Sequence, residues 1–159
     1  MKIRKGIVAD MPAVLHLIKE LATFEKEPDA VVLTVDDLVR DGFSETPAFY
    51  TFVAEEAGEL IGMALYYYRY STWKGRTIHL EDLIVTQAKR GTGAGKALYE
   101  AVINEGYNQQ VRRIEWAVLD WNQHAIDFYK KSGATILDDW RVVQMDENGI
   151  QKFINKTMI

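Results

Sequence analysis

The sequence contains no cysteine and only three prolines among its 159 residues. Without cysteine there is no disulfide framework, no thiol nucleophile and no cysteine-ligated zinc site, and the cytoplasm is the expected compartment. No apolar run approaches the roughly 20 residues of a membrane helix. The first residues, 1–6, also lack the apolar core of a signal peptide. We therefore expect a cytoplasmic protein with no membrane partner.

An excess of positive charge is missing as well. The chain has 19 basic and 23 acidic side chains, which gives a formal net charge of −4. A nucleic-acid partner would require a clustered basic face, so none is expected. The three histidines, His16, His79 and His124, are far apart in the sequence and do not form a metal-binding pattern such as HExxH. We therefore expect no metal site.

Apolar residues are plentiful, at 48% of the chain, so a full hydrophobic core can form. The length is that of one ordinary domain, and the chain shows neither an internal repeat nor a low-complexity tract. We therefore predict a single domain over residues 1–159.

The apolar periodicity predicts the element order β-α-α-β-β-β-α-β-α-β. This order indicates an α/β (α+β) domain with a mixed central sheet of about six to seven strands and about four flanking helices. Strands are expected over residues 2–8, 49–55, 60–70, 77–86, 112–119, 134–137 and 140–145, with a further short strand at the C-terminus. Helices are expected after Asp10, after Thr34 as far as Gly42, from the segment 89–96, which opens a helix, to about Asn108, and over 122–132.

Local signals mark several helix ends. Asp10 is expected to cap the first helix, with Pro12 in its first turn. The segment Thr34-Val35-Asp36-Asp37 is typical of a capping box at the second helix. Gly133 is expected to end the last helix as a C-cap.

A glycine-rich turn, Arg90-Gly91-Thr92-Gly93-Ala94-Gly95, lies between a predicted strand and a predicted helix. Such a turn brings backbone close to a ligand and offers unpaired N–H groups and the positive end of the helix dipole to an anion. Arg90 and Lys96 add positive charge, so a pyrophosphate is the natural occupant. The spacing departs from both the dinucleotide GxGxxG turn and the P-loop, and an ordinary flexible turn remains the alternative to an anion site.

A second motif follows about 30 residues later. Asn122, Ala125, Tyr129 and Gly133 match the pattern Asn-x-x-Ala-x-x-x-Tyr-x-x-x-Gly, and Arg90, Gly93 and Gly95 match Q/R-x-x-G-x-G/A. Together the two motifs resemble the GNAT superfamily of N-acetyltransferases. The segments 70–76, 80–82 and 118–122 resemble the spermidine/spermine acetyltransferase family, and most closely its thialysine acetyltransferase branch. The resemblance implies a single GNAT-like domain.

The resemblance also implies a co-substrate and its site. Acetyl-coenzyme A would be the acetyl donor, without a metal. The resemblance places the thioester against Leu83, Ile84 and Val85, beside a backbone N–H at a strand bulge that stabilises the developing oxyanion. Its pyrophosphate would lie on the turn. The implied coenzyme contacts are Leu83, Ile84, Val85, Arg90, Gly91, Thr92, Gly93, Ala94, Gly95, Lys96 and Asn122.

The resemblance assigns the catalytic roles as well. Tyr129 would protonate the leaving thiolate, since a phenol is still protonated at neutral pH. Glu81 would act as the base through water, because an alkylammonium must lose a proton before it attacks. Strand alternation places the neighbouring Asp82 on the opposite face. Either Glu81 or Tyr129 could instead be an ordinary strand or helix residue.

The implied substrate is a small cationic amine. Carboxylates and aromatic faces attract an ammonium group, and the set carried over is Phe24, Glu25, Glu81, Asp120, Asp139 and Trp140. Ser71-Thr72 replaces the Asp-Pro of the polyamine branch, so thialysine or a short diamine is favoured over a long polyamine. The other open functions are acetylation of a protein or peptide, and non-catalytic binding of acyl-coenzyme A. A homodimer is expected from the resemblance and from the aromatic-rich segment 66–73.

Overall fold

The computed structural model describes residues 1–157, which form two compact units. Unit 1 spans Met1–Ala117 and unit 2 begins at Val118. The elements of unit 1 are β1 (Lys2–Lys5), η1 (Val8–Asp10), α1 (Met11–Phe24), α2 (Val35–Gly42), β2 (Tyr50–Glu56), β3 (Glu59–Ser71), β4 (Gly75–Val85), η2 (Gln87–Lys89), α3 (Ala94–Asn108) and β5 (Ile114–Glu115). Unit 2 contains α4 (Gln123–Lys131) and α5 (Glu147–Thr157).

Unit 1 is built on a mixed sheet of five strands in the order β1-β2-β3-β4-β5. The first four strands are antiparallel to their neighbours, and β5 is parallel to β4. Ala57 and Gly58 both have positive φ, at 52° and 84°, which is the geometry of a tight turn that matches strand twist. The hairpin expected around this turn is confirmed as β2 and β3.

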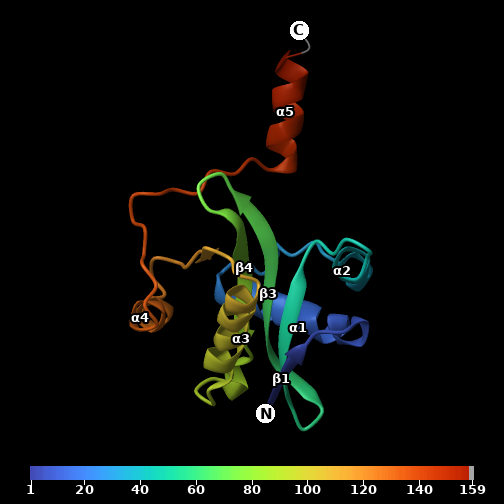
Figure 1. Cartoon of the computed structure of the whole chain (residues 1–159). Helices are drawn as coiled ribbons and strands as arrows, with labels where there is room; N and C mark the ends of the chain where they lie inside the picture. The colour runs from blue at the N-terminus through green and yellow to red at the C-terminus, as the bar shows by residue number, and fades with distance from the viewer. Residues whose placement is uncertain (158–159) are drawn as a thin grey trace. The chain divides into compact units, whose positions relative to one another are not determined.

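Helices cover both faces of this sheet, with α3 in front of β3 and β4 in Figure 1 and α1 behind. On the α1 side, Met63 and Leu65 of β3 and Ile84 of β4 share a buried cluster with Val14 and Leu17 of α1. The alternate residues of β3 face α3: a Cβ added to Gly62 would lie 3.2 Å from Leu98. The sheet therefore separates two packed layers, as expected for an α/β class domain.

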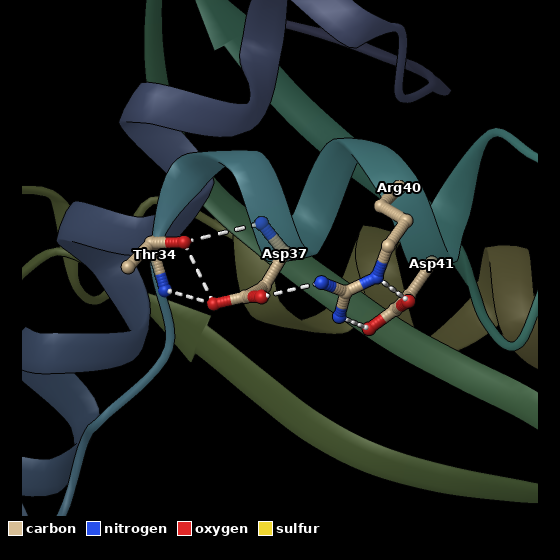
Figure 2. Close-up of polar contacts among 4 residues, drawn as sticks. All are labelled: Thr34, Asp37, Arg40 and Asp41. Atoms are coloured by element: carbon tan, nitrogen blue, oxygen red, sulfur yellow. Dashed lines mark hydrogen bonds and ion pairs between the residues drawn. The ribbon is translucent and has the colours of Figure 1, made fainter.

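Helix α2 begins with the predicted capping box (Figure 2). The backbone N–H of Asp37 donates to Thr34 Oγ1 at 3.2 Å, and the N–H of Thr34 donates to Asp37 Oδ2 at 3.0 Å. Arg40, one turn later, joins Asp37 to Asp41 through ion pairs of 2.8 Å. Two of the N–H groups that a helix start leaves unpaired are thus satisfied by one reciprocal pair.

The expected cap of α1 is wrong. Asp10 makes no side-chain cap to α1; its carboxylate instead accepts from the Ile7 N–H at 2.8 Å and binds both terminal nitrogens of Arg4. Arg4 also donates to Glu55 at 2.7 Å. The two-point, charge-assisted hydrogen bond from Arg4, together with the Ile7 N–H, occupies the carboxylate, so it does not cap α1.

The strand count is also lower than expected. The predicted strand over 112–119 is reduced to Ile114–Glu115, and residues 134–137 and 140–145 form no strand in the part of the chain that the structure describes. The expected C-terminal strand is instead the helix α5. Local alternation favoured strands here, but a strand requires a hydrogen-bonded neighbour, and the sequence does not reveal whether one is present.

Among the described residues, no helix is long and apolar enough to cross a membrane.

Candidate active site

The strand β4 carries an irregularity that shapes the candidate site. Leu65 of β3 lies opposite Asp82, but the next residue, Tyr66, lies opposite Leu80. The ladder therefore skips Glu81, which is the extra residue of a β-bulge. A bulge in the strand before the glycine turn is what the family resemblance implies. It lies at Glu81, two residues before the expected segment Leu83–Val85.

The bulge places two carboxylates on one face of the sheet. Asp82 shares the face of its partner Leu65, and His79 shares the face of its partner Tyr67, two residues further along β3. Glu81 also turns to this face, because its Oε2 lies 3.5 Å from Nε2 of His79. The expectation that Asp82 and Glu81 point to opposite faces is therefore wrong, since the extra residue interrupts the two-residue alternation.

Burial raises the pKa of Asp82 from its ordinary value near 3.8 to about 6, and the negative charges of Glu81 and Glu25 add to the effect. Partial desolvation also raises the pKa of Glu25, at the residue that follows α1. Three acidic groups thus meet on this face, and their mutual repulsion favours the uptake of a positive charge or a proton. A carboxylate with a pKa near 6 is also a stronger base than an ordinary one.

The glycine-rich turn forms the start of α3. Gly91 and Gly93 have φ values of 79° and 88°, a left-handed backbone that favours glycine, and a Cβ at either would meet no atom within 4 Å. Gly93 is the N-cap and supplies no side-chain acceptor to the helix. The first N–H groups of α3 therefore receive no acceptor from the N-cap side chain, and an anion can bind them. This geometry fits the pyrophosphate of coenzyme A.

The edge of β4 provides a second feature of a coenzyme site. Within unit 1, β5 pairs with β4 only at Ile78 and His79, so no strand of that unit lies along the β5 side of residues 80–85. Of the three residues expected to contact the thioester, Ile84 has its side chain in the core on the α1 side. Ile84 could therefore meet a ligand only through its backbone.

Arg90 links the glycine turn to the end of α1. Its guanidinium carbon lies 5.0 Å from the ring centroid of Phe24, and its Nε donates to the carbonyl of Val85 at 3.3 Å. Phe24, at the end of α1, therefore lies beside Arg90 of the turn, and Glu25 follows it in the chain. Thr92 stabilises the loop by donating to the carbonyl of Lys89 at 2.8 Å, and Lys96 forms an exposed ion pair with Glu100 at 2.8 Å.

Unit 2 contains the second motif. The side chain of Asn122 accepts from the N–H of Ala125 at 3.2 Å and so caps α4. Tyr129 is 8% exposed, and its ring packs edge-on against Phe128 with centroids 5.4 Å apart. Gly133, with φ at 95°, follows the end of α4 and confirms the expected C-cap. Tyr129 and Glu81 belong to different units, so their approach to one another is a matter of proposal.

The remaining expected substrate residues lie in unit 2 and are exposed. Asp120 precedes α4, and Asp139 and Trp140 lie in the segment between α4 and α5, with Trp140 68% exposed. They are separated in the chain from the three carboxylates of unit 1.

The structure places Ser71-Thr72 at the tip of the β3–β4 hairpin. Ser71 ends β3, and its Oγ accepts from the N–H groups of Trp73 and Lys74 at 3.2 Å, which closes the β3–β4 turn. Glu81 lies six strand residues beyond Gly75, which corresponds to roughly 20 Å of extended chain. The hairpin tip is thus remote from the carboxylate cluster of its own chain.

Sequence reasoning missed three members of the site: Asp82, His79 and Tyr67. The segment Leu80-Glu81-Asp82 matches the family, but regular strand alternation predicts that Asp82 points away from the site. A bulge leaves no signature in composition or spacing, so only the strand register reveals these neighbours. Among the described residues, no group of three or more histidine, aspartate or glutamate side chains is arranged to hold a metal ion.

Comparisons with known proteins identify the family and the fold. Residues 12–134 match the model of the "Acetyltransferase (GNAT) family". The chain is 37% identical to a thialysine N-epsilon-acetyltransferase from Bos taurus, with 97% of each chain covered. It is also 37% identical to the thialysine N-epsilon-acetyltransferase of Caenorhabditis elegans, over 89% of each chain.

A solved integron cassette protein from V. cholerae has the same fold. The TM-score is 0.79 at 22% identity, with 96% of each chain covered.

Proposed function

Because the chain belongs to the acetyltransferase (GNAT) family, we propose that it transfers the acetyl group of acetyl-coenzyme A to a primary amine of a small cationic substrate. The observation that carries this proposal is the cluster of Glu25, Glu81 and Asp82 on one face of the sheet, joined to the glycine turn through Phe24 and Arg90. Such a cluster attracts an ammonium group and can then remove its proton.

The residues of unit 1 would bind the coenzyme. The free N–H groups at the start of α3 hold the pyrophosphate, with Arg90 and Lys96 adding positive charge. The open edge of β4 at residues 83–85 supplies backbone groups for the acyl arm and for the carbonyl oxygen as it gains charge. Acetyl-coenzyme A supplies an activated thioester carbonyl at this edge.

The carboxylates would act on the amine. An alkylammonium with a pKa near 10.4 is protonated at neutral pH and cannot attack a carbonyl. Glu81 accepts a proton from it, through water, and Asp82 beside it shares this role because its pKa is about 6. The neutral nitrogen then forms the new C–N bond as the C–S bond breaks.

Tyr129 would complete the proton balance. Its hydroxyl donates a proton to the departing sulfur, as a phenol can at neutral pH. The amine nitrogen loses two protons in all. One passes through the carboxylates to solvent. The loss of the other is matched by the proton that the sulfur gains, so the reaction releases one proton overall. Tyr129 is returned to its neutral form by solvent.

We propose thialysine or a short diamine as the amine. The support is the similarity of the chain, over nearly its full length, to thialysine N-epsilon-acetyltransferases. This chain has Ser71-Thr72, at the hairpin tip, where the polyamine branch has Asp-Pro. The absence of that acidic residue agrees with a short substrate. Asp120, Asp139 and Trp140 would complete the amine site from unit 2.

The test is the release of free thiol from acetyl-coenzyme A in the presence of a panel of amines. Acetyl transfer should require an amine and should fall strongly in Glu81→Gln and Asp82→Asn. Asp36→Asn, an exposed carboxylate of α2, is the matched control and should retain full activity. If no amine accelerates thiol release while calorimetry still detects coenzyme binding, the protein is not an amine acetyltransferase.

The two units would form one catalytic domain. The family match over 12–134 crosses their boundary at Val118, and the motif residues are divided between them. A single cooperative unfolding transition is expected in calorimetry, and two separate transitions would contradict it.

We also propose a homodimer in the cytoplasm. Within the aromatic-rich segment, Tyr66 is 1% exposed and belongs to the core, whereas Tyr70 and Trp73 are more than 75% exposed at the hairpin tip. Exposed aromatic side chains of this kind are enriched at interfaces. Sedimentation at micromolar concentration should detect a dimer, and a species of only 18.2 kDa would contradict the proposal.

A further inference from the structure

His79 is a half-buried histidine on the same face of β4 as the carboxylate cluster, and the proposed reaction does not use it. Its side chain is 20% exposed, and its ring lies against that of Tyr67 with centroids 5.2 Å apart. Its Nε2 lies 3.5 Å from Glu81 Oε2. The strand register holds this arrangement, because His79 is paired with Tyr67 on one side and with Glu115 on the other.

The surroundings of the other ring nitrogen, Nδ1, indicate which tautomer of His79 is favoured. Nδ1 is buried and has no hydrogen-bond partner within the described part of the chain. A proton on Nδ1 would be a buried N–H donor without an acceptor, which is costly. A proton on Nε2 faces a carboxylate instead. Of the two tautomers, the geometry therefore favours the one with its proton on Nε2.

Some of the charged side chains around His79 form ion pairs with one another. Glu115 on β5 is paired with Arg69 of β3 and with Arg113. Tyr67 has a raised pKa because of burial, with further contributions from the charge and hydrogen bonding of Glu81. The remaining acidic neighbour on this face is Asp82, with Glu25 next to it. Of these groups, Glu81 is the one that lies next to Nε2 of His79.

We propose that His79 is a positioning residue for the acetyl transfer: its Nε2–H donates to Glu81 and holds this carboxylate at the β-bulge, where the amine loses its proton. The inference rests on the proposed function, since it assigns the base to Glu81. The separation of 3.5 Å is long for a hydrogen bond, as is common before substrate binds, and shortens in the loaded enzyme. Tyr67 supports the same carboxylate from β3.

Two variants separate a positioning role from a packing role. His79→Phe retains a flat ring against Tyr67 but has no donor. His79→Gln retains an N–H donor at the position of Nε2 but has no ring. His16→Gln, an exposed histidine of α1, is the matched control. Loss of one hydrogen bond to a charged group should lower kcat roughly 10-fold in His79→Phe, with an unchanged KM for acetyl-coenzyme A.

The pH profile gives the second kinetic readout. In His79→Phe the acid limb of the kcat profile should move to higher pH, because Glu81 loses a donor that favours its charged form. In His79→Gln both kcat and the limb should return toward those of the wild type. If His79→Phe keeps the wild-type kcat and limb, or if His79→Gln is as impaired as His79→Phe, the proposal is wrong.

A measurement without turnover keeps this result separate from the proposed function. The chain has only three histidines, so ¹⁵N-histidine labelling gives three ring spin systems. His79 should carry its proton on Nε2, and Glu81→Gln should shift this resonance but not that of His16. A proton on Nδ1, or no response to Glu81→Gln, overturns the contact even in an active enzyme. If the contact is found and the wild type acetylates no amine, the proposed function fails and the contact stands.

Discussion

Glu81 and Asp82 are adjacent in the sequence, yet both carboxylates lie on the face of the sheet that packs against α1. The β-bulge at Glu81 produces this arrangement, because the ladder passes directly from Asp82 opposite Leu65 to Leu80 opposite Tyr66. Burial raises the pKa of Asp82 to about 6, and the negative charge of Glu81 beside it adds to the effect, so ionised Asp82 costs stability.

Asp82→Asn should stabilise the protein at pH 8 while it impairs acetyl transfer. The native pKa of about 6 lies above the ordinary value of 3.8, so the native state binds the proton more tightly. The penalty for ionised Asp82 is therefore absent below about pH 4 and present in full above pH 6. The free energy of unfolding should rise by about 1–3 kcal/mol at pH 8 and change little at pH 4.

Denaturant titrations at the two pH values check this prediction. Asp36→Asn, on exposed α2, should change neither value. An unchanged unfolding free energy of Asp82→Asn at pH 8 would show that Asp82 is not destabilised by its surroundings.

Asp10→Asn should have the opposite pH dependence. The hydrogen bond from Arg4, with the Ile7 N–H and the charge of Arg4, lowers the pKa of Asp10. The stabilising pair is therefore present above the ordinary pKa of about 4 and is lost as the pH falls through the lowered native value. At pH 7 the variant should lose about 2–3 kcal/mol of unfolding free energy, since Arg4 keeps Glu55 as a partner.

The loss in Asp10→Asn should shrink when the same titration is repeated near pH 3. A loss of equal size at both pH values would mean that shape rather than charge sets the contribution of Asp10.

Gly93→Ala should weaken coenzyme binding through the backbone. Gly93 has a φ of 88° at the N-cap of α3, and a side chain there strains the conformation although the space is open. Gly58→Ala is a matched control, because Gly58 has a φ of 84° and equally open surroundings in the β2–β3 turn. Both variants should lose about 1 kcal/mol of stability, and only Gly93→Ala should raise the coenzyme Kd in calorimetry.

If Gly93→Ala and Gly58→Ala bind the coenzyme with equal affinity, the pyrophosphate does not bind at the glycine turn.

Tyr129→Phe should lower kcat by about 10²–10⁴-fold with little change in coenzyme affinity. The hydroxyl is needed mainly when the thiolate forms, and the ring of Tyr129 would still pack against Phe128. Tyr107→Phe, at an 82% exposed position of α3, is the control. Wild-type turnover in Tyr129→Phe, measured where chemistry limits the rate, would mean that water or another residue protonates the sulfur.

Thialysine or a short diamine should be acetylated with a higher kcat/KM than spermine. A spermine molecule carries more positive charges along its length than thialysine or a short diamine, and some of them would lack partners in this site. Competition assays with equal amine concentrations measure the ratio directly. Spermine as the best substrate would contradict the assignment of the substrate class.

The candidate site could be predicted only in part. The glycine turn and the motif around Tyr129 are contiguous in sequence, and local backbone requirements such as the φ of Gly93 and Gly133 make them visible there. Asp82 and His79 could not be assigned, because their roles depend on a strand register that a single extra residue changes.

The sequence by itself determined the elements with strong local signals: the Thr34–Asp37 capping box, the β2–β3 hairpin and the helix that begins after Gly93. These depend on interactions between residues a few positions apart. Only the tertiary structure decided that Asp10 pairs with Arg4, that residues 134–145 form no strand, and that Glu81 and Asp82 share a face. Each of these outcomes depends on which residue pairs with a buried charge or which strand pairs with a backbone edge, and the possible partners are distant in the chain.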